Sequence, residues 1–367
     1  MLRRRFWKPF TGFSVMVAAP DRNRLLDLIR AFSDRRIVVV GDVIADEFIY
    51  GEISRISREA PVMILRFERK ELHPGGCGNA AANLAALGAR VAVVGVVGRD
   101  AAGRQLVQAL RRRGVDTSGI LPVSGYRTPT KTRILAGSVH STRQQVIRID
   151  HEPDQRIADT LTRDLIAQLR RASRHAQAVI LSDYNYGVVS PAVADAVREL
   201  AHRRGLLVTV DSRYRLAELK GFTSATPNQS EVEALYGHHI DDLATLERVG
   251  RDLRRKLGLR ALLITRGKDG MSLFENGRSA VHLSVVGSDE PVDVTGAGDT
   301  VIATYTLALA AGATFLEAAH LANHAGGIVV MKRGTATASP QELAASVAFA
   351  TAGGSFRNGK GKNSPAR

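Results

Sequence analysis

An aspartate stands on each side of three small residues in the stretch PVDVTGAGDT: Asp293, then Gly296, Ala297 and Gly298, then Asp299. Glycines allow a sharp turn into a helix, and an acidic residue in the first turn interacts favourably with the helix dipole. Small residues at a helix start also leave backbone N–H groups accessible to an anion such as phosphate. The stretch therefore admits a structural interpretation, a helix start, and a chemical one, an anion site.

The chemistry that this pattern could perform is phosphoryl transfer. The amides of residues 296–298 would stabilise the charge on a transferred phosphoryl group, and Asp299 would accept the proton of the attacking hydroxyl. The sequence contains neither a G-x-x-x-x-G-K-[ST] loop nor a G-x-G-x-x-G turn after a strand. The run alone is weak evidence, so the elements around it must support the chemistry.

Short β-rich runs alternate with helical stretches along most of the chain. We expect strands at 36–42, 90–98, 178–184, 206–212 and 261–267. We expect helices at 101–114, 191–204, 229–236 and 243–257, a glycine turn entering a helix at 74–89, and a mostly helical segment at 298–350. This alternation predicts an α/β fold, a doubly wound and mostly parallel sheet flanked by helices.

Two regions, about 46–72 and 127–152, contain strand-like runs without helices between them. They predict a small antiparallel β-sheet lid that could close over a ligand or pair with a second subunit. The chain then divides into a basic N-terminal extension with a first helix (1–34), the α/β domain with its lid (35–350) and a disordered basic tail (351–367).

Several polar residues fall at the carboxyl ends of the predicted strands: Asp42, Asp183, Asp211 and the segment 265–267. Ligands of open parallel sheets bind outside these ends. The rim that they form is the predicted active site.

The net charge of +15 is concentrated at the two ends of the chain, which carry +10 of it in residues 1–36 and 351–367. No pattern typical of nucleic-acid binding accompanies it, and no apolar run approaches the length of a membrane span. The single cysteine, Cys77, cannot form an internal disulfide, which favours the cytoplasm. The start, RRRFWK, resembles a twin-arginine export signal, but Pro9 and Gly12 interrupt its apolar stretch, so an extended start before Met16 is the preferred interpretation.

Four motifs, in a fixed order over roughly residues 35–345, resemble those of the ribokinase-like sugar kinases of the PfkB family. They are PGGCGNAAANLAALGA (74–89), TPNQSEVEAL (226–235), TRGKDG (265–270) and DVTGAGD (293–299). The resemblance implies a ribokinase-like fold and an ATP-dependent sugar kinase that uses Mg²⁺ and a monovalent cation.

The segments 41–64 and 130–152 further resemble the kinase domain of bacterial ADP-heptose synthesis, which phosphorylates D-glycero-β-D-manno-heptose 7-phosphate at O1. A sugar that carries a phosphate requires a cationic pocket. The candidates for it are Arg133, Arg143 and Arg148, with Lys131 and Gln144. Two lysines that heptose kinases carry, in D-Y-x-K-G and D-P-K-G, are replaced here by Tyr186 and Arg213.

The resemblance also implies roles for individual residues. Those expected to bind the sugar are Asp42, Gly75, Gly76, Asn79 and Asp183. Those expected to bind the nucleotide are Asn228, Glu231, Thr265, Gly267, Asp293, Thr295 and Asn323. Among them Glu231 would contact Mg²⁺, Asn323 would approach the base, and Asp293 would shape the monovalent-cation site.

Structural alternatives stand beside several of these roles. Asp42 could cap a turn, Asn228 could cap a helix, and Asn323 could be a satisfied buried amide. The arginines could be a solvated face of the lid. For the whole chain, the alternatives are a kinase for another sugar or nucleoside, and a non-catalytic binding protein that lacks the two lysines. We expect no nucleic-acid or membrane partner and a homodimer formed through the lid.

Overall fold

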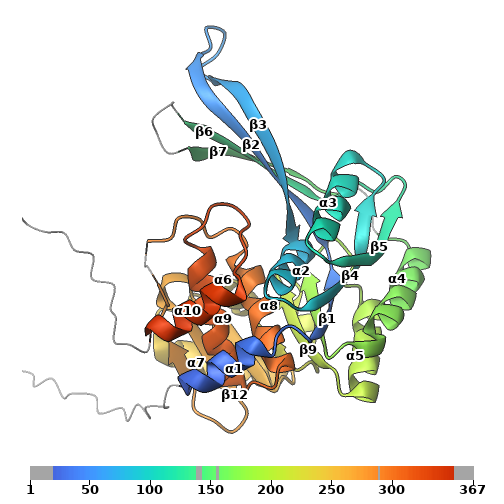
Figure 1. Cartoon of the computed structure of the whole chain (residues 1–367), viewed down its shortest axis with the longest axis vertical. Coiled ribbons are helices and arrows are strands. Elements are labelled where there is room, and N and C mark those ends of the chain that lie inside the picture. Colours follow the sequence, from blue (N-terminus) through green and yellow to red (C-terminus); the bar gives the residue numbers. More distant parts are fainter. Residues whose placement is uncertain (1–19, 138–142, 154–156, 288–289, 351–367) are drawn as a thin grey trace, which may run out of the picture.

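The computed structural model describes residues 20–137, 143–153, 157–287 and 290–350 (Figure 1). The predictions of an export-like signal and of a disordered tail concern residues 1–19 and 351–367, which lie outside the described residues. The twin-arginine and tail interpretations therefore stay predictions.

The body is built on a nine-stranded sheet with the order β13-β12-β11-β10-β9-β8-β1-β4-β5. The strands are β1 (Arg36–Gly41), β4 (Arg90–Gly98), β5 (Asp116–Val123), β8 (Ala178–Asp183), β9 (Leu207–Ser212), β10 (Ser224–Ala225), β11 (Ala261–Thr265), β12 (Met271–Glu275) and β13 (Val281–Leu283). All neighbours pair in parallel except β11–β12 and β12–β13, which are antiparallel. The prediction of a mostly parallel sheet is confirmed.

Helices cover both faces of this sheet (Figure 1). They are α1 (Arg22–Arg30), α2 (Cys77–Ala86), α3 (Ala101–Arg112), α4 (Asp159–Ala172), α5 (Pro191–Arg204), α6 (Gln229–Tyr236), α7 (Leu243–Lys256), α8 (Ala297–Ala310), α9 (Phe315–Val329) and α10 (Pro340–Ala350). Three short 3-10 helices are η1 (Ser173–His175), η2 (Leu216–Glu218) and η3 (Gly267–Asp269). The helices that the sequence predicts at 191–204 and 229–236 have these bounds in the structure.

Two hydrophobic cores lie on opposite faces of the sheet, because successive residues of a strand point to opposite sides. Ile37 and Val39 of β1 pack into the core under α1, α2, α3, α8, α9 and α10. Val38 and Val40 pack into the core under α4, α5, α6 and α7. Strands buried on both faces explain the continuous apolar run of β1.

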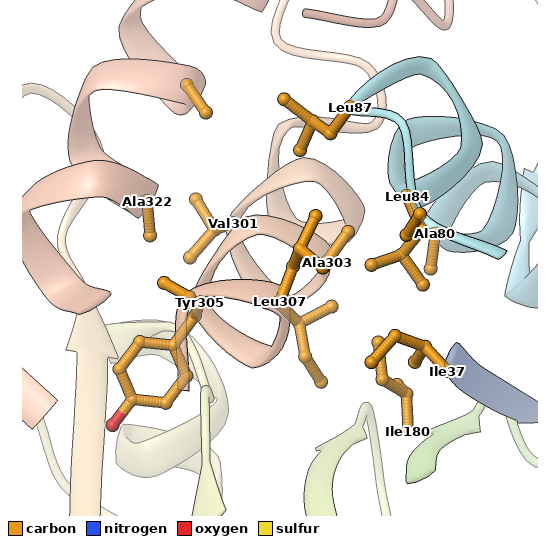
Figure 2. Close-up of a cluster of buried hydrophobic side chains, with 14 of the residues drawn as sticks. Ile37, Ala80, Leu84, Leu87, Ile180, Val301, Ala303, Tyr305, Leu307 and Ala322 are labelled. Carbon is orange, nitrogen blue, oxygen red and sulfur yellow. The ribbon is translucent and has the colours of Figure 1, made fainter. Parts of the chain in front are cut away.

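The packing of α2 against α8 in the first core positions the candidate site. Figure 2 shows Leu84 of α2 and Leu307 of α8 above Ile37 and Ile180 of the sheet. Burying a leucine side chain stabilises a fold by about 1.5–3 kcal/mol relative to leaving it exposed. These contacts therefore hold both helices against the same part of the sheet.

A four-stranded lid projects from the body (Figure 1). Its order is β3-β2-β6-β7, with β2 (Val43–Ile56), β3 (Met63–Gly76), β6 (Thr130–Gly137) and β7 (Gln144–His151). The predicted lid is present, but it is not wholly antiparallel, because β2 and β6 pair in parallel. Strands that are not joined by a hairpin are free of the antiparallel constraint, and β6 follows β2 only after β3, α2, β4, α3 and β5.

Candidate active site

Four polar strand ends meet at one edge of the sheet, as the sequence predicts. Asp42 follows β1, Asp183 ends β8, Asp211 lies near the end of β9, and Thr265 ends β11. These strands run in the same direction through parallel pairings. Their carboxyl ends therefore share an edge, which is where open α/β sheets bind ligands.

The start of α8 is built as an anion site. Gly296 is its N-cap, with a φ of 78°, a left-handed conformation that favours glycine, and no side chain caps this helix. A Cβ on Gly296 would strike the amide of Asn79, whereas a Cβ on Gly298 would meet open space. Nothing in the protein's packing thus requires glycine at 298, and the space beside it is available to a phosphate at the helix N-terminus.

Asp299 is buried in the first turn of α8, at 5% exposure. Its Oδ2 accepts a hydrogen bond from Nδ2 of Asn79 (2.8 Å), and its Oδ1 accepts one from the hydroxyl of Tyr184 (2.9 Å). Burial raises the pKa of Asp299 to about 6, although both hydrogen bonds favour the ionised form. A carboxylate with such a pKa is ionised at neutral pH and suits a general base.

Asn79 is itself oriented by a second asparagine one turn further along α2. Nδ2 of Asn83 donates to Oδ1 of Asn79 (3.2 Å), and Oδ1 of Asn83 accepts from the hydroxyl of Thr300 in α8 (3.0 Å). The amide of Asn79 therefore turns its NH₂ group toward Asp299 and the carbonyl of Gly296 (3.3 Å). The 74–89 and 293–299 motifs are therefore in direct contact in the structure.

Asp42 holds the loop after β8 and does not face a cavity. Its carboxylate is 1% exposed and accepts backbone N–H bonds from Tyr184 (2.8 Å), Tyr186 (3.0 Å) and Val188 (3.2 Å). Burial raises its pKa to about 6. These hydrogen bonds go to this loop, and the expected contact of Asp42 with sugar hydroxyls stays a prediction.

Asp183 is also buried and supports the same loop. It accepts from the backbone N–H of Asn185 (3.1 Å) and from the hydroxyl of Ser212 (2.7 Å). Asn185, with a φ of 67°, is the one residue other than glycine that has a positive φ among the described residues. The loop is thus held tightly, and Asp183 positions it.

The two glycines of the 74–89 motif lie where the lid joins the body. A Cβ on Gly75 would strike the carboxylate of Asp46 in β2, and Gly76, with a φ of 54°, is the N-cap of α2. Asp46 forms a buried ion pair with Arg133 of β6 (2.5 Å). Gly75 therefore leaves room for the carboxylate of Asp46, Gly76 allows the turn into α2, and Arg133 balances the charge of Asp46.

A cavity of about 760 Å³ lies between the lid and the sheet edge. Among the described residues, four cations line it: Lys131, Arg148, Arg213 and Arg215. Arg148 is paired with Asp150 (2.8 Å), and Arg215 is paired with Glu218 (2.7 Å). No described acidic group lies within ion-pair distance of the other two, and burial together with the charge of Arg213 lowers the pKa of Lys131. These two cations can bind an anion without breaking an ion pair.

Three predicted members of the phosphate pocket do not line this cavity. Arg133 is instead held in the buried ion pair with Asp46. Arg143 is paired with Glu68 of the lid (2.7 Å), and Gln144 is exposed at the start of β7. The residues of β7 that do line it, Arg148 and Asp150, lie on the same face closer to the body. The register of the lid strands determines which side chains reach the cavity, and this register is set by tertiary pairing.

A second cavity, of about 190 Å³, lies at the α8 N-terminus. Its mainly apolar wall contains the predicted nucleotide residues Thr265, Gly267 and Asn323 together with Ala297 and Gly298. Nδ2 of Asn323 donates to the carbonyl of Ser284 (2.7 Å), so this side chain is both a satisfied amide and part of the wall. An apolar slot beside a helix N-terminus fits a nucleotide base followed by its phosphates.

Asn228 and Glu231 form a capping box at the start of α6. Oδ1 of Asn228 accepts from the backbone N–H of Glu231 (2.8 Å), and Oε2 of Glu231 accepts from that of Asn228 (2.9 Å). Burial raises the pKa values of Glu231 and of the nearby Asp211. No group of three metal-ligating side chains occurs among the described residues, but Mg²⁺ in such sites binds one or two carboxylates plus substrate phosphates, which Asp211 and Glu231 fit.

Asp293 ties the start of the TGAGD turn to the loop after α9. It accepts from the backbone N–H groups of Thr295 (2.9 Å) and Gly334 (2.9 Å). The backbone N–H groups of Val292 and Asp293 in turn donate to the carbonyl of Val330. Asp293 and Thr295 therefore shape the approach to the anion site through the backbone.

The sequence analysis missed the role of Tyr184, whose hydroxyl contacts Asp299, and that of Asp46, which packs on Gly75. Tyr184 follows directly after Asp183 at a strand end, so its position was a usable signal.

Among the described residues, none of the helices has the length and apolar character that a membrane span requires.

Comparison with known proteins gives a family match over residues 34–342, to the pfkB family carbohydrate kinase model. A relative from Trichlorobacter lovleyi, named Bifunctional protein HldE, is 41% identical over 330 residues, which are 90% of this chain and 66% of the relative. The chain thus spans just under two thirds of that relative's length.

Two solved structures share the fold at low sequence identity. Arabidopsis thaliana ribokinase, complexed with ribose and ATP, matches with a TM-score of 0.67 at 21% identity and covers 86% of this chain and 99% of its own. Phosphofructokinase-2 from Escherichia coli, in complex with potassium, matches with a TM-score of 0.70 at 18% identity over the same shares. With the family match over most of its length, the chain belongs to the pfkB family of carbohydrate kinases.

Proposed function

We propose that this protein transfers the γ-phosphoryl group of ATP to a sugar hydroxyl, with Asp299 as the general base. The observation that carries the proposal is that Asp299 adjoins one lining residue of each cavity. Tyr184, which donates to its carboxylate, lines the cationic cavity, and Gly298, its chain neighbour, lines the apolar one. A sugar in the first and ATP in the second would meet at the N-terminus of α8.

The chain's own groups can stabilise the transferred phosphoryl group and accept the proton that the reaction releases. The N-terminal amides of α8 stabilise the charge of the transferred group, and Asp299 takes the proton of the attacking hydroxyl. Mg²⁺, which neutralises the phosphates of ATP, would be held beside Asp211 and Glu231. A monovalent cation would lie near the backbone that Asp293 organises, as potassium accompanies the related phosphofructokinase-2 structure.

The acceptor that we propose is D-glycero-β-D-manno-heptose 7-phosphate, converted to the 1,7-bisphosphate at O1. Segments 41–64 and 130–152 resemble heptose kinases, and the relative named HldE is 41% identical. Lys131 and Arg213, two cations of one cavity without an acidic partner among the described residues, would bind the 7-phosphate. Arg213 stands in the segment where heptose kinases carry one of their lysines.

A panel of acceptors, each with ATP and Mg²⁺ and assayed for ADP release, tests this function. Phosphorylated heptose should react best, and Arg213→Ala should raise its KM at least about tenfold while leaving the KM of ATP unchanged. The matched control is Arg66→Ala, on the outer part of the lid, where Arg66 pairs with Glu52. Turnover of unphosphorylated sugars alone would contradict the phosphate subsite. Binding of ligands without any ADP release would indicate a binding protein.

The lid is the surface through which we propose that two copies associate. Its described residues expose eight large apolar side chains: Ile53, Ile56, Val62, Met63, Phe67, Val146, Ile147 and Ile149. Exposed apolar clusters of this kind mark interfaces. Sedimentation of the wild type should give a dimer, and the double variant Phe67→Glu/Ile147→Glu should be a monomer. A monomeric wild-type chain would contradict the proposal.

Because ATP is the proposed donor, we place the enzyme in the cytoplasm.

A further inference from the structure

Tyr184 stands where the cationic cavity meets the carboxylate of Asp299. Its ring lines that cavity, and its hydroxyl donates to Oδ1 of Asp299 at 2.9 Å. The opposite oxygen, Oδ2, is held from the body side by Asn79 of α2. A hydroxyl group that reaches Asp299 from the cavity therefore arrives on the side of Tyr184.

The backbone of Tyr184 is fixed independently of Asp299. Its N–H donates to the buried carboxylate of Asp42 (2.8 Å), and the following residue, Asn185, has the positive φ of 67° that turns the chain. Lys131 lies over its ring, with Nζ 5.2 Å from the ring centroid. These contacts hold the phenol in one place, which is what orienting another side chain requires.

We propose that Tyr184 is a positioning residue for the reaction: its phenol orients the Asp299 carboxylate and keeps Oδ1 directed at the acceptor hydroxyl. This inference rests on the function proposed above. Asp299 has further lone pairs beyond those that Asn79 and Tyr184 use, since an ionised carboxylate accepts up to about four hydrogen bonds. The acceptor hydroxyl can thus donate to Oδ1 beside the phenol.

A donor to an ionised carboxylate also favours the ionised form. Removal of the phenol hydroxyl alone leaves burial unchanged and takes this stabilisation away. The other titratable groups that face Asp299 are Asp46 of β2, Lys131 of β6, Asp211 of β9 and Cys77 of α2. All of them remain in a Tyr184→Phe variant, so a change in the titration of Asp299 reports on the hydroxyl.

The test is the pH dependence of kcat/KM for Tyr184→Phe, with ATP, Mg²⁺ and heptose 7-phosphate and the full chain. The midpoint of the acid limb should rise by about one pH unit. Loss of a hydrogen bond to a charged group destabilises the ionised form of Asp299 by an amount that corresponds to a pKa change of about one unit. Tyr186→Phe is the matched control. Its hydroxyl lies in the same loop and cavity but bonds Glu152 (3.3 Å), so the midpoint should stay in place whatever happens to KM.

A second measurement needs no turnover. The loss of stability caused by Tyr184→Phe should be larger at pH 8 than at pH 4, because the hydrogen bond is stronger to the ionised carboxylate. The inference is overturned if the midpoint of the acid limb in Tyr184→Phe equals that of the wild type and its loss of stability is the same at pH 4 and pH 8. It is also overturned if both quantities change equally in Tyr186→Phe. If Asp299→Asn retains turnover, the proposed base fails as well. If Asp299→Asn is inactive while Tyr184→Phe titrates like the wild type, the role of Tyr184 alone fails.

Discussion

Replacing Asp299 by asparagine should reduce turnover strongly and at the same time stabilise the fold. Burial raises the pKa of Asp299 from 3.8 to about 6. The unfolded chain therefore loses its proton first as the pH rises, and ionisation favours the unfolded state between these two values. The difference of about 2 pH units corresponds to about 3 kcal/mol of lost stability above pH 7.

Asparagine removes this cost with little disturbance of the hydrogen bonds. Its carbonyl can accept from Asn79, and its NH₂ can donate to the hydroxyl of Tyr184, which is also an acceptor. The expected gain is up to about 3 kcal/mol at pH 7–8, and it should shrink below about 1 kcal/mol near pH 4. Turnover should fall by about 10²- to 10⁴-fold with loss of the base.

Urea unfolding of the wild type and Asp299→Asn at several pH values measures this difference. Asp42→Asn is an informative control, because burial raises the pKa of Asp42 to about 6 as well. Its two oxygens accept three backbone N–H bonds, so an amide NH₂ would face a donor in either orientation, and this variant should lose stability. A gain for Asp299→Asn that does not depend on pH, or no gain at all, would refute the reasoning.

Three further predictions concern the same region. Gly298→Ala should melt like the wild type but lose at least about tenfold in kcat/KM for ATP, because its Cβ fills the anion site. Gly296→Ala should melt at a lower temperature, and equal melting temperatures for the two variants would argue against this assignment. Arg133→Ala should lower the free energy of unfolding by about 3–5 kcal/mol, because it leaves the buried Asp46 unpaired. The double variant Arg133→Ala/Asp46→Ala should recover this stability, and a single variant as stable as the wild type would contradict the prediction. In the wild type, kcat/KM should fall as the pH drops through about 6, and a flat profile down to pH 5 would exclude Asp299 as the base.

The sequence was informative where the signal is local. Strands such as β1 and helices such as α6 follow from apolar runs, caps and glycine stops, and DVTGAGD predicts a helix start with an acid in its first turn. The parallel sheet then places the strand ends on one edge without further information. These inferences needed no knowledge of side-chain direction.

Side-chain direction depends on tertiary contacts, and there the sequence was insufficient. Asp42 turns toward a loop that lies 142 to 146 residues further along the chain, and Tyr184 reaches Asp299 across 115 residues. Arg143 and Lys131 are equally plausible cations in the sequence, yet the lid register pairs Arg143 with Glu68 and directs Lys131 into the cavity. Periodicity alone does not carry that information.

The junction between lid and body limits how this enzyme can be re-engineered. β2 begins at Val43, directly after Asp42, and β3 ends at Gly76, directly before α2, so no spacer separates the lid from the residues around Asp299. Chimeras that exchange lids between related kinases therefore need their crossover points outside 42–86. A crossover inside that segment would mix parts of two active sites, so the lid and the helix that carries Asn79 have to be exchanged as one unit.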